Sequence, residues 1–380
     1  MINDTRYATS RLEDYRSVAE VNVPLFMLFD QTMTLGAEWE RQELNDPASM
    51  TATDASGVMI GAVSGDASAR NTKNSANTSA LYFEDNIEAT ASTNIIPGLR
   101  FDYHNQFGGN WSPSLNVSQG LGELFRVKAG IARAFKAPNL YQSSEGYLLS
   151  TRGNGCPNTI ASGSCYLLGN DNLDPEISIN KEIGLEFTWE GYDAGITWFR
   201  NDYKNKIVSG TDIIGYASNG NNILRWENGG KAVVEGLEAS LTVPLMRDTL
   251  SWRTNGTYMI TSENKKTGNP LSIIPKYTVN TMLDWQVTDK LSANTTWTMY
   301  GRQKPREYAE TRNETGVMSS KEVGAYSVVG IGVNYQLTKN LRANTGISNL
   351  FDKQIYRENE GASTYNEPGR AYYAGVTMSF

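Results

Sequence analysis

The chain lacks the residues on which most enzymes and metal sites depend. Its 380 residues include one histidine and two cysteines. A site with several histidine ligands is therefore excluded, and no G-x-S-x-G sequence accompanies His104 to suggest a nucleophilic serine. We expect no enzymatic activity, no metal site and no bound cofactor.

Long apolar runs and an excess of basic residues are also missing. No stretch approaches the roughly 18 consecutive apolar residues of a membrane-spanning helix. The formal net charge is −7 and no phosphate-binding G-x-x-x-x-G-K-[ST] loop is present, so we do not expect a nucleic-acid partner.

What remains is a composition that favours β structure, with 35 Gly, 20 Tyr and 8 Trp. Side chains of a strand alternate between two faces, and about fifteen segments show that period. These predicted strands are Tyr15–Pro24, Thr32–Glu43, Ser79–Ala91, Pro97–His104, Ser112–Gln119, Leu124–Phe135, Ser178–Glu190, Tyr192–Ile207, Ala232–Leu245, Thr249–Ser262, Ile274–Val287, Lys290–Tyr300, Ala325–Leu337, Asn340–Asn349 and Arg370–Phe380.

Each predicted strand has one apolar and one polar face. Leu99, Phe101 and Tyr103, for example, alternate with Arg100 and Asp102. In a sandwich the apolar faces would meet in a dry core, whereas in a membrane barrel they contact lipid and the polar faces line the lumen.

The connections favour the barrel, because short and longer ones alternate along the chain. The longer connections are Leu44–Thr78, Asn105–Trp111, Lys136–Ile177, Val208–Lys231, Glu263–Ile273, Gly301–Gly324 and Leu350–Gly369. Short periplasmic turns and long extracellular loops are typical of an up-and-down outer-membrane barrel. Such barrels have an even strand number, so an odd count predicts that at least one strand precedes Met1 in a longer protein.

The last predicted strand places Tyr372, Val376, Met378 and Phe380 on one face. It resembles the C-terminal signal by which bacterial outer-membrane barrels are recognised by their assembly machinery. We therefore expect that machinery as a partner, and lipid and lipopolysaccharide as neighbours.

Five segments together resemble the TonB-dependent outer-membrane receptors. They are R-A-F-K-A-P-N-L-Y (133–141), N-L-D-P-E (172–176), N-K-E-I-G-L-E (180–186), S-N-L-F-D-K-Q-I-Y (348–356) and the aromatic terminus. The resemblance implies a transmembrane antiparallel barrel of 22 strands in the bacterial outer membrane. An N-terminal plug fills such a barrel, and a short box before the plug engages the TonB complex. Residues 1–380 then correspond to part of the barrel, without the plug and the first strands.

Within that family the chain resembles the receptors for ferric enterobactin. The segments N-G-C-P-N-T-I (154–160), S-I-I-P-K-Y-T (272–278) and Y-G-R-Q-K-P-R (300–306) carry this likeness. It implies uptake of a ferric catecholate siderophore, a trianionic complex with aromatic faces. Arginine suits its charge, and tyrosine or tryptophan suits its flat apolar surface. Candidate ligand-binding residues in the long loops are Arg152, Tyr147, Tyr166, Arg225, Trp226, Arg302, Arg306 and Tyr308.

Two alternatives to a transport receptor stay open. The chain could form a passive or engineered pore without a plug, or its loops could serve as a docking surface for phages or colicins. The close pair Cys156 and Cys165 predicts one local disulfide, in an oxidising compartment, with two free thiols as the alternative.

Overall fold

The structure, a computed structural model, describes residues 9–26, 28–47, 71–145, 147–150, 165–210, 212–216, 220–266, 268–305, 321–358, 362–363 and 365–379. It is built from strands, whose bounds are β1 Arg11–Phe26, β2 Asp30–Asn45, β3 Lys73–Thr90, β4 Thr93–His104, β5 Gly108–Leu121, β6 Phe125–Lys136, β7 Leu148–Ser150, β8 Cys165–Leu168, β9 Glu176–Trp189, β10 Tyr192–Lys204, β11 Ile207–Ser209, β12 Gly215–Tyr216, β13 Asn222–Asn228, β14 Ala232–Met246, β15 Leu250–Asn264, β16 Tyr277–Thr288, β17 Leu291–Tyr300, β18 Tyr326–Thr338, β19 Leu341–Ser348 and β20 Ala371–Met378. Among the described residues, no helix has the length and apolar character needed to cross a membrane.

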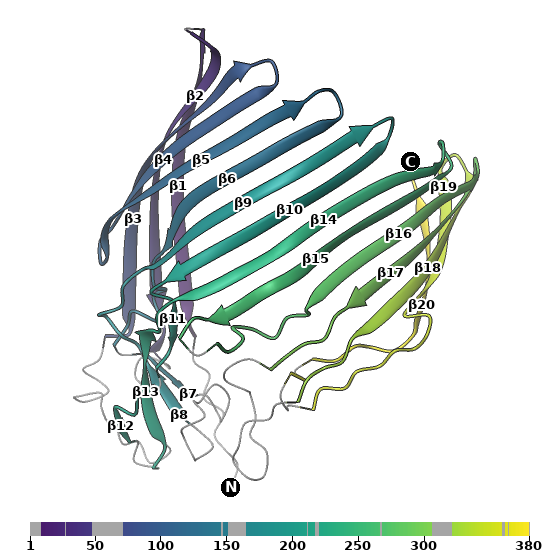
Figure 1. Cartoon of the computed structure of the whole chain (residues 1–380). Helices are drawn as coiled ribbons and strands as arrows, with labels where there is room; N and C mark the ends of the chain where they lie inside the picture. Colours follow the sequence, from purple (N-terminus) through teal and green to yellow (C-terminus); the bar gives the residue numbers. More distant parts are fainter. Residues whose placement is uncertain are drawn as a thin grey trace.

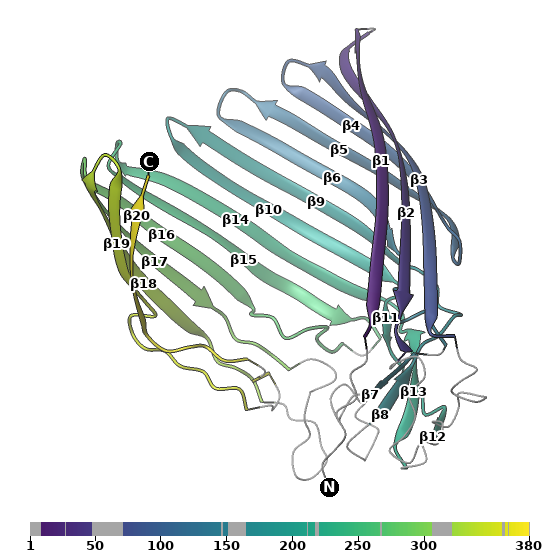
Figure 2. The same ribbon diagram turned by 180° about the vertical axis from the view of Figure 1, so that it is seen from behind.

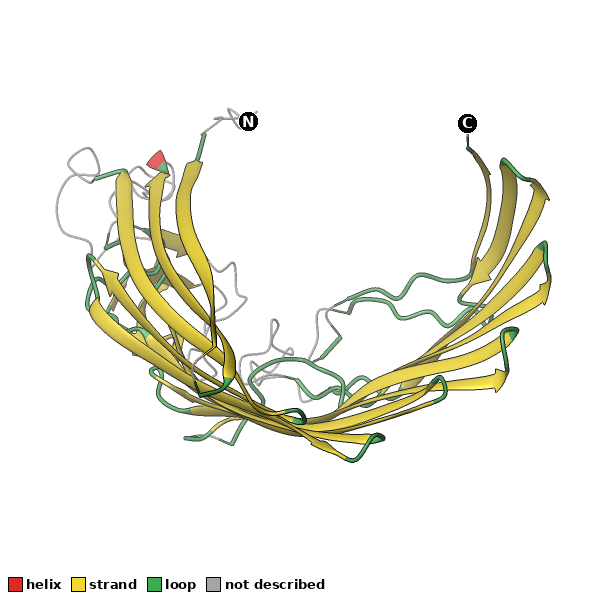
Figure 3. Cartoon of the chain, turned by 90° about the horizontal axis from the view of Figure 1, so that it is seen from above, coloured by secondary structure: helices red, strands yellow, loops and turns green. Residues whose placement is uncertain are grey.

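One antiparallel sheet of 15 strands dominates the molecule, in the order β1-β2-β3-β4-β5-β6-β9-β10-β14-β15-β16-β17-β18-β19-β20. Each strand pairs with the next long strand along the chain, so the sheet is an up-and-down meander (Figure 1). Seen from above, it bends into a wide arc with β1 and β20 at its two ends (Figure 3). The predicted fold class and the fifteen strands are confirmed.

Short turns join the strands at one end of the sheet, which we call the turn end. The longer connections join the other ends of the strands, which we call the loop end (Figure 2). The hairpin between β9 and β10 shows why the turns are tight. Glu190 and Gly191 have φ angles of 45° and 89°, and Trp189 pairs with Tyr192 across them. Two consecutive positive φ angles define a type I′ turn, whose twist matches that of the flanking strands.

One predicted long connection is wrong. Only residues 105–107 separate β4 from β5, because β5 begins at Gly108 rather than at Ser112. His104 pairs with Gly108, which has a φ angle of 73°, a conformation that glycine adopts without strain. The strict alternation of short and long connections therefore fails at this position.

The two faces of the sheet differ in the way that the alternation predicted. Large apolar side chains such as Leu81, Ile183 and Trp285 are about half exposed on the outer face. A soluble sheet would bury such a band, whereas a barrel presents it to lipid. The inner face carries ion pairs, among them Arg16–Glu38 (2.7 Å).

The C-terminal strand β20 follows the predicted pattern as far as it is described. Tyr372, Val376 and Met378 are more than half exposed on its outer face and pair with Ile347, Ala343 and Leu341 of β19. Phe380 lies outside the described residues. On its inner face, Tyr373 lies over Gly346, where a Cβ atom would overlap the phenol ring.

Candidate functional site

Two long connections at the loop end build a small sheet that the sequence did not predict. Strand β13 pairs in parallel with β8, and β11, β12 and β7 extend this sheet (Figure 1). The break before β11 explains part of the miss. Asn205 has a φ angle of 53°, so the chain leaves β10 there instead of continuing to Ile207 as predicted.

The small sheet has an apolar cluster on each face. Leu148, Leu168 and Ile223 pack together on one face, and Cys165, Leu167 and Leu224 pack together on the other. Ile223, Leu224 and Cys165 are fully buried. Burial on both faces gives these loops a rigid core of their own.

Three predicted ligand residues lie on or beside this core. Tyr166 packs against the first cluster and Trp226 against the second, so both are anchored. Arg225 lies on the same face of β13 as Ile223, but it is exposed, and its carbonyl accepts a hydrogen bond from Gly210 N–H at 2.8 Å. The small sheet therefore holds one arginine outward from a fixed backbone.

Tyr147 belongs to a third cluster, which joins the connection after β6 to the ends of β2 and β3. It packs with Tyr141 against Leu44, Ala76 and Leu140, and the two tyrosine rings are 4.6 Å apart. Burial, together with nearby Tyr141 and Asp46, raises the pKa of the Tyr147 phenol. Tyr147 thus packs this loop against the sheet.

A cluster of phenol groups links two further connections at the loop end, the one between β17 and β18 and the one between β19 and β20. The rings of Tyr300 and Tyr326 stack 4.8 Å apart, and the hydroxyls of Tyr326 and Tyr365 are 3.1 Å apart. Gln303, which is 3% exposed, donates from Nε2 to the Tyr365 hydroxyl at 2.6 Å, and the Tyr326 hydroxyl donates to Glu367. We call Tyr300, Gln303, Tyr326, Tyr365 and Glu367 the phenol cluster.

The remaining predicted site residues are placed in part. Arg302 is exposed and lies 3.4 Å from Glu322. Arg152, Arg306, Tyr308 and Cys156 lie outside the described residues. Cys165 is disulfide-bonded, and its predicted pairing with Cys156 stays a prediction.

The inner face of the main sheet carries a charged network whose residues lie on β1, β2 and β4. Arg100 contacts Glu38 at 3.0 Å and Asp102 at 2.8 Å, and Glu38 also pairs with Arg16. His104 is buried, and its Nδ1 accepts a hydrogen bond from Gln106 N–H. His104 therefore accepts the backbone hydrogen bond of the turn between β4 and β5.

This architecture matches one known family. The sequence model of the family described as TonB dependent receptor-like, beta-barrel matches residues 2–350. The chain belongs to the TonB-dependent receptor β-barrel family. Its sheet is therefore the wall of a bacterial outer-membrane barrel, with the loop end extracellular and the turn end periplasmic. The family consists of transport receptors rather than enzymes.

Individual members of this family are similar over almost the whole chain. The ferric enterobactin receptor PirA of Pseudomonas aeruginosa is 55% identical over 99% of the chain, and the ferrienterobactin receptor of Escherichia coli is 46% identical over 97%. The chain spans 51% of each of these relatives.

A solved structure gives the same result in three dimensions. A variant of the ferric enterobactin receptor of Pseudomonas aeruginosa in complex with enterobactin superposes with a TM-score of 0.89 at 46% identity. The match covers 100% of this chain and 56% of that one.

Proposed function

We propose that this chain is barrel wall and extracellular loops of a receptor for TonB-dependent uptake of a ferric catecholate siderophore. The observation that carries the proposal is the match, over the full chain, to a receptor that has enterobactin bound. Iron enters this scheme only as part of the cargo, so no resident cofactor is needed.

The loop geometry supports an anionic, aromatic ligand. Arg225 projects from β13 with its backbone fixed by pairing to Leu168 of β8, and Tyr166 and Trp226 are held close by. A guanidinium group that is already positioned loses little conformational entropy when it binds an anion. Arg302, and the predicted Arg152, Arg306 and Tyr308, would add positive charge and aromatic surface from other loops.

Coupling to TonB is assigned in this proposal to parts of the receptor outside residues 1–380. The relatives are about twice as long as the chain, and β1 and β20 each have a partner on one side only among the described strands. We infer that further barrel strands close the gap in the arc, and that a plug within the lumen contacts the charged network of Arg16, Glu38 and Arg100.

A binding titration of the complete receptor tests the proposal. Ferric enterobactin should quench tryptophan fluorescence at submicromolar ligand. In the Arg225→Ala variant the affinity should fall about tenfold or more, because a hydrogen bond to a charged group is worth about 1.5–3 kcal/mol. Arg247→Ala is the matched control, since Arg247 is exposed at the turn end, 3.7 Å from Glu190.

The outcome also separates the alternatives. Quenching by another chelate but not by ferric enterobactin would keep the fold and reject the substrate. A steady conductance of the complete protein in a planar bilayer, without any ligand response, would favour a passive pore. Adsorption of a phage or colicin that survives loss of siderophore binding would favour a docking surface.

A further inference from the structure

On the outer face of the sheet, cationic side chains lie next to aromatic residues, on the side toward the loop end. On β10, Arg200 follows Trp198 on the same face, one step closer to the loop end. Arg41 follows Trp39 in the same way on β2, and the Lys276 ammonium lies 4.9 Å from the centre of the Tyr258 ring. Aromatic belts mark the interface between hydrocarbon and headgroups. The cations therefore lie at headgroup height.

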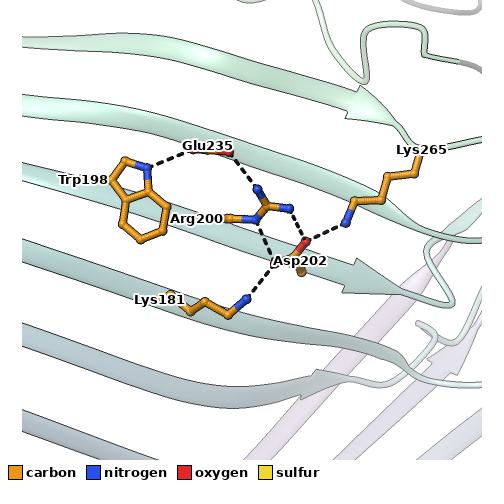
Figure 4. A network of polar contacts seen from close by, with 6 residues as sticks. All are labelled: Lys181, Trp198, Arg200, Asp202, Glu235 and Lys265. Carbon is orange, nitrogen blue, oxygen red and sulfur yellow. Dashed lines mark hydrogen bonds and ion pairs between the residues drawn. The ribbon is translucent and has the colours of Figure 1, made fainter.

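The best-defined of these sites is a network across β9, β10, β14 and the end of β15 (Figure 4). Arg200 contacts Asp202 through Nε at 3.0 Å and Glu235 through Nη1 at 3.0 Å. Two lysines reach the same aspartate from opposite sides, Lys181 at 3.0 Å and Lys265 at 2.7 Å. We call Lys181, Arg200, Asp202, Glu235 and Lys265 the outer-face network.

Strand register places this network on the lipid side. Trp198 pairs with Ile183, and Arg200 pairs with Lys181 and Glu235. Ile183 is 52% exposed on the apolar outer face, and Lys181 lies two residues further toward the loop end on that face. The Trp198 indole donates to Glu235 Oε1 at 2.9 Å, so it links the apolar band to the network.

The network has capacity for an anion. It combines three cationic groups with two carboxylates, which leaves one net positive charge. Each lysine ammonium has three N–H donors and uses one of them on Asp202. The Lys181 and Lys265 side chains are 40% and 36% exposed, so their other donors face outward around a carboxylate that fixes their spacing.

From this geometry we infer that the outer-face network binds the phosphate of a phosphorylated lipid headgroup in the outer leaflet. A phosphate presents several acceptor oxygens and can bridge two ammonium groups. The acyl chains of the same lipid would then lie along Ile183, Trp198 and Ile196, on the side of the network toward the turn end. An anion free in solution would gain nothing from that apolar surface, whereas a lipid gains from both parts of the site.

Native mass spectrometry of the complete receptor tests this inference. The probes are lipid A with two phosphates and the same lipid with both phosphates removed. The Lys181→Gln/Lys265→Gln variant should bind the phosphorylated lipid about tenfold to thirtyfold more weakly, because each lysine raises the affinity about fivefold. Its affinity for the dephosphorylated lipid should not change.

Two controls separate charge at this site from folding and from general electrostatics. Lys128→Gln breaks a more exposed pair with Glu186 on the inner face and should bind lipid as the parent does. Lys181→Arg/Lys265→Arg keeps both charges and should retain binding. The inference is overturned if the glutamine variant binds phosphorylated lipid normally, if it loses both lipids alike, or if inorganic phosphate displaces the lipid.

Discussion

The hydroxyl groups of Tyr326 and Tyr365 meet at 3.1 Å, although one opens strand β18 and the other lies in the connection before β20. Gln303, from the connection that leads into β18, donates to the same Tyr365 oxygen and is almost completely buried. This oxygen therefore ties the β17–β18 connection to the β19–β20 connection.

Removing that oxygen should loosen the loops and leave the barrel intact. Tyr365→Phe leaves the buried amide of Gln303 without an acceptor, which costs about 1–3 kcal/mol. We expect the amides of the Gln303–Val323 bridge to exchange hydrogen about tenfold faster, as read by mass spectrometry. Tyr356→Phe, on the same connection but 70% exposed, should exchange as the parent does. Equal exchange in both variants would contradict this role.

Glycine at position 236 is expected to be necessary for the packing of β14 between its neighbours. A Cβ atom there would lie 2.7 Å from Phe199 Cζ and 2.8 Å from the Tyr258 carbonyl oxygen. Gly236→Ala should therefore destabilise the barrel by about 1–3 kcal/mol. The measurement is the temperature at which the band shifts on a semi-native gel. Gly324→Ala meets nothing within 4 Å and should leave that temperature unchanged.

Sequence alone predicted the main sheet because every long strand contacts two different environments. An apolar outer face and a polar inner face impose a period of two, and that period is readable without knowing any partner. Residue Tyr192 begins a strand as predicted, and Tyr300 ends one as predicted. The resemblance to known receptors then supplied the family, which pattern alone could not.

For the loop end, the sequence predicted which residue types the connections contain but not how the connections fold. Strands β7 and β11 have three residues each, too few to show a period, and β8 pairs with β13 from a different connection. Tyr147, Tyr166 and Trp226 were predicted as ligand residues because aromatic residues in loops suit such a ligand. The structure shows that they pack against loop cores, and their contact with a ligand stays a prediction. The partners of Gln303 lie far along the chain, so no local signal marked it.

The disulfide at Cys165 should stabilise the small sheet without affecting the barrel. Cys165 is fully buried between Leu167 and Leu224. With the predicted partner Cys156, the bond closes a short loop, and its loss should cost about 2–3 kcal/mol. In Cys165→Ala, hydrogen exchange at Ile223 and Leu224 should rise, while the amides of β14 stay protected.

Reduction provides the control for this variant. A reducing agent should accelerate exchange at Ile223 in the parent protein and should add nothing in Cys165→Ala. A peptide that links Cys156 to Cys165 should appear in a non-reducing digest. A free thiol at Cys156 in the folded parent would refute the predicted pairing.

The connection before β20 should respond to acid through Asp352. This residue has a φ angle of 57°, and its Oδ1 accepts hydrogen bonds from the Arg370 N–H at 2.7 Å and from Gln354 at 3.2 Å. The bond from the Arg370 backbone, followed by that from Gln354, lowers the pKa of Asp352. The carboxylate thus stabilises the folded connection above about pH 4, and the contribution is lost as the pH falls through the lower, folded-state pKa.

The amide shift of Arg370, followed by NMR in protein labelled at arginine, reports this titration directly. It should stay constant from neutral pH down to about pH 4 and change below that value, because an ordinary aspartate titrates near there. Asp352→Asn keeps an acceptor oxygen but has no proton to gain, so its Arg370 shift should be flat over the same range. A midpoint above pH 4 in the parent protein, or the same titration in the asparagine variant, would show that another group controls this turn.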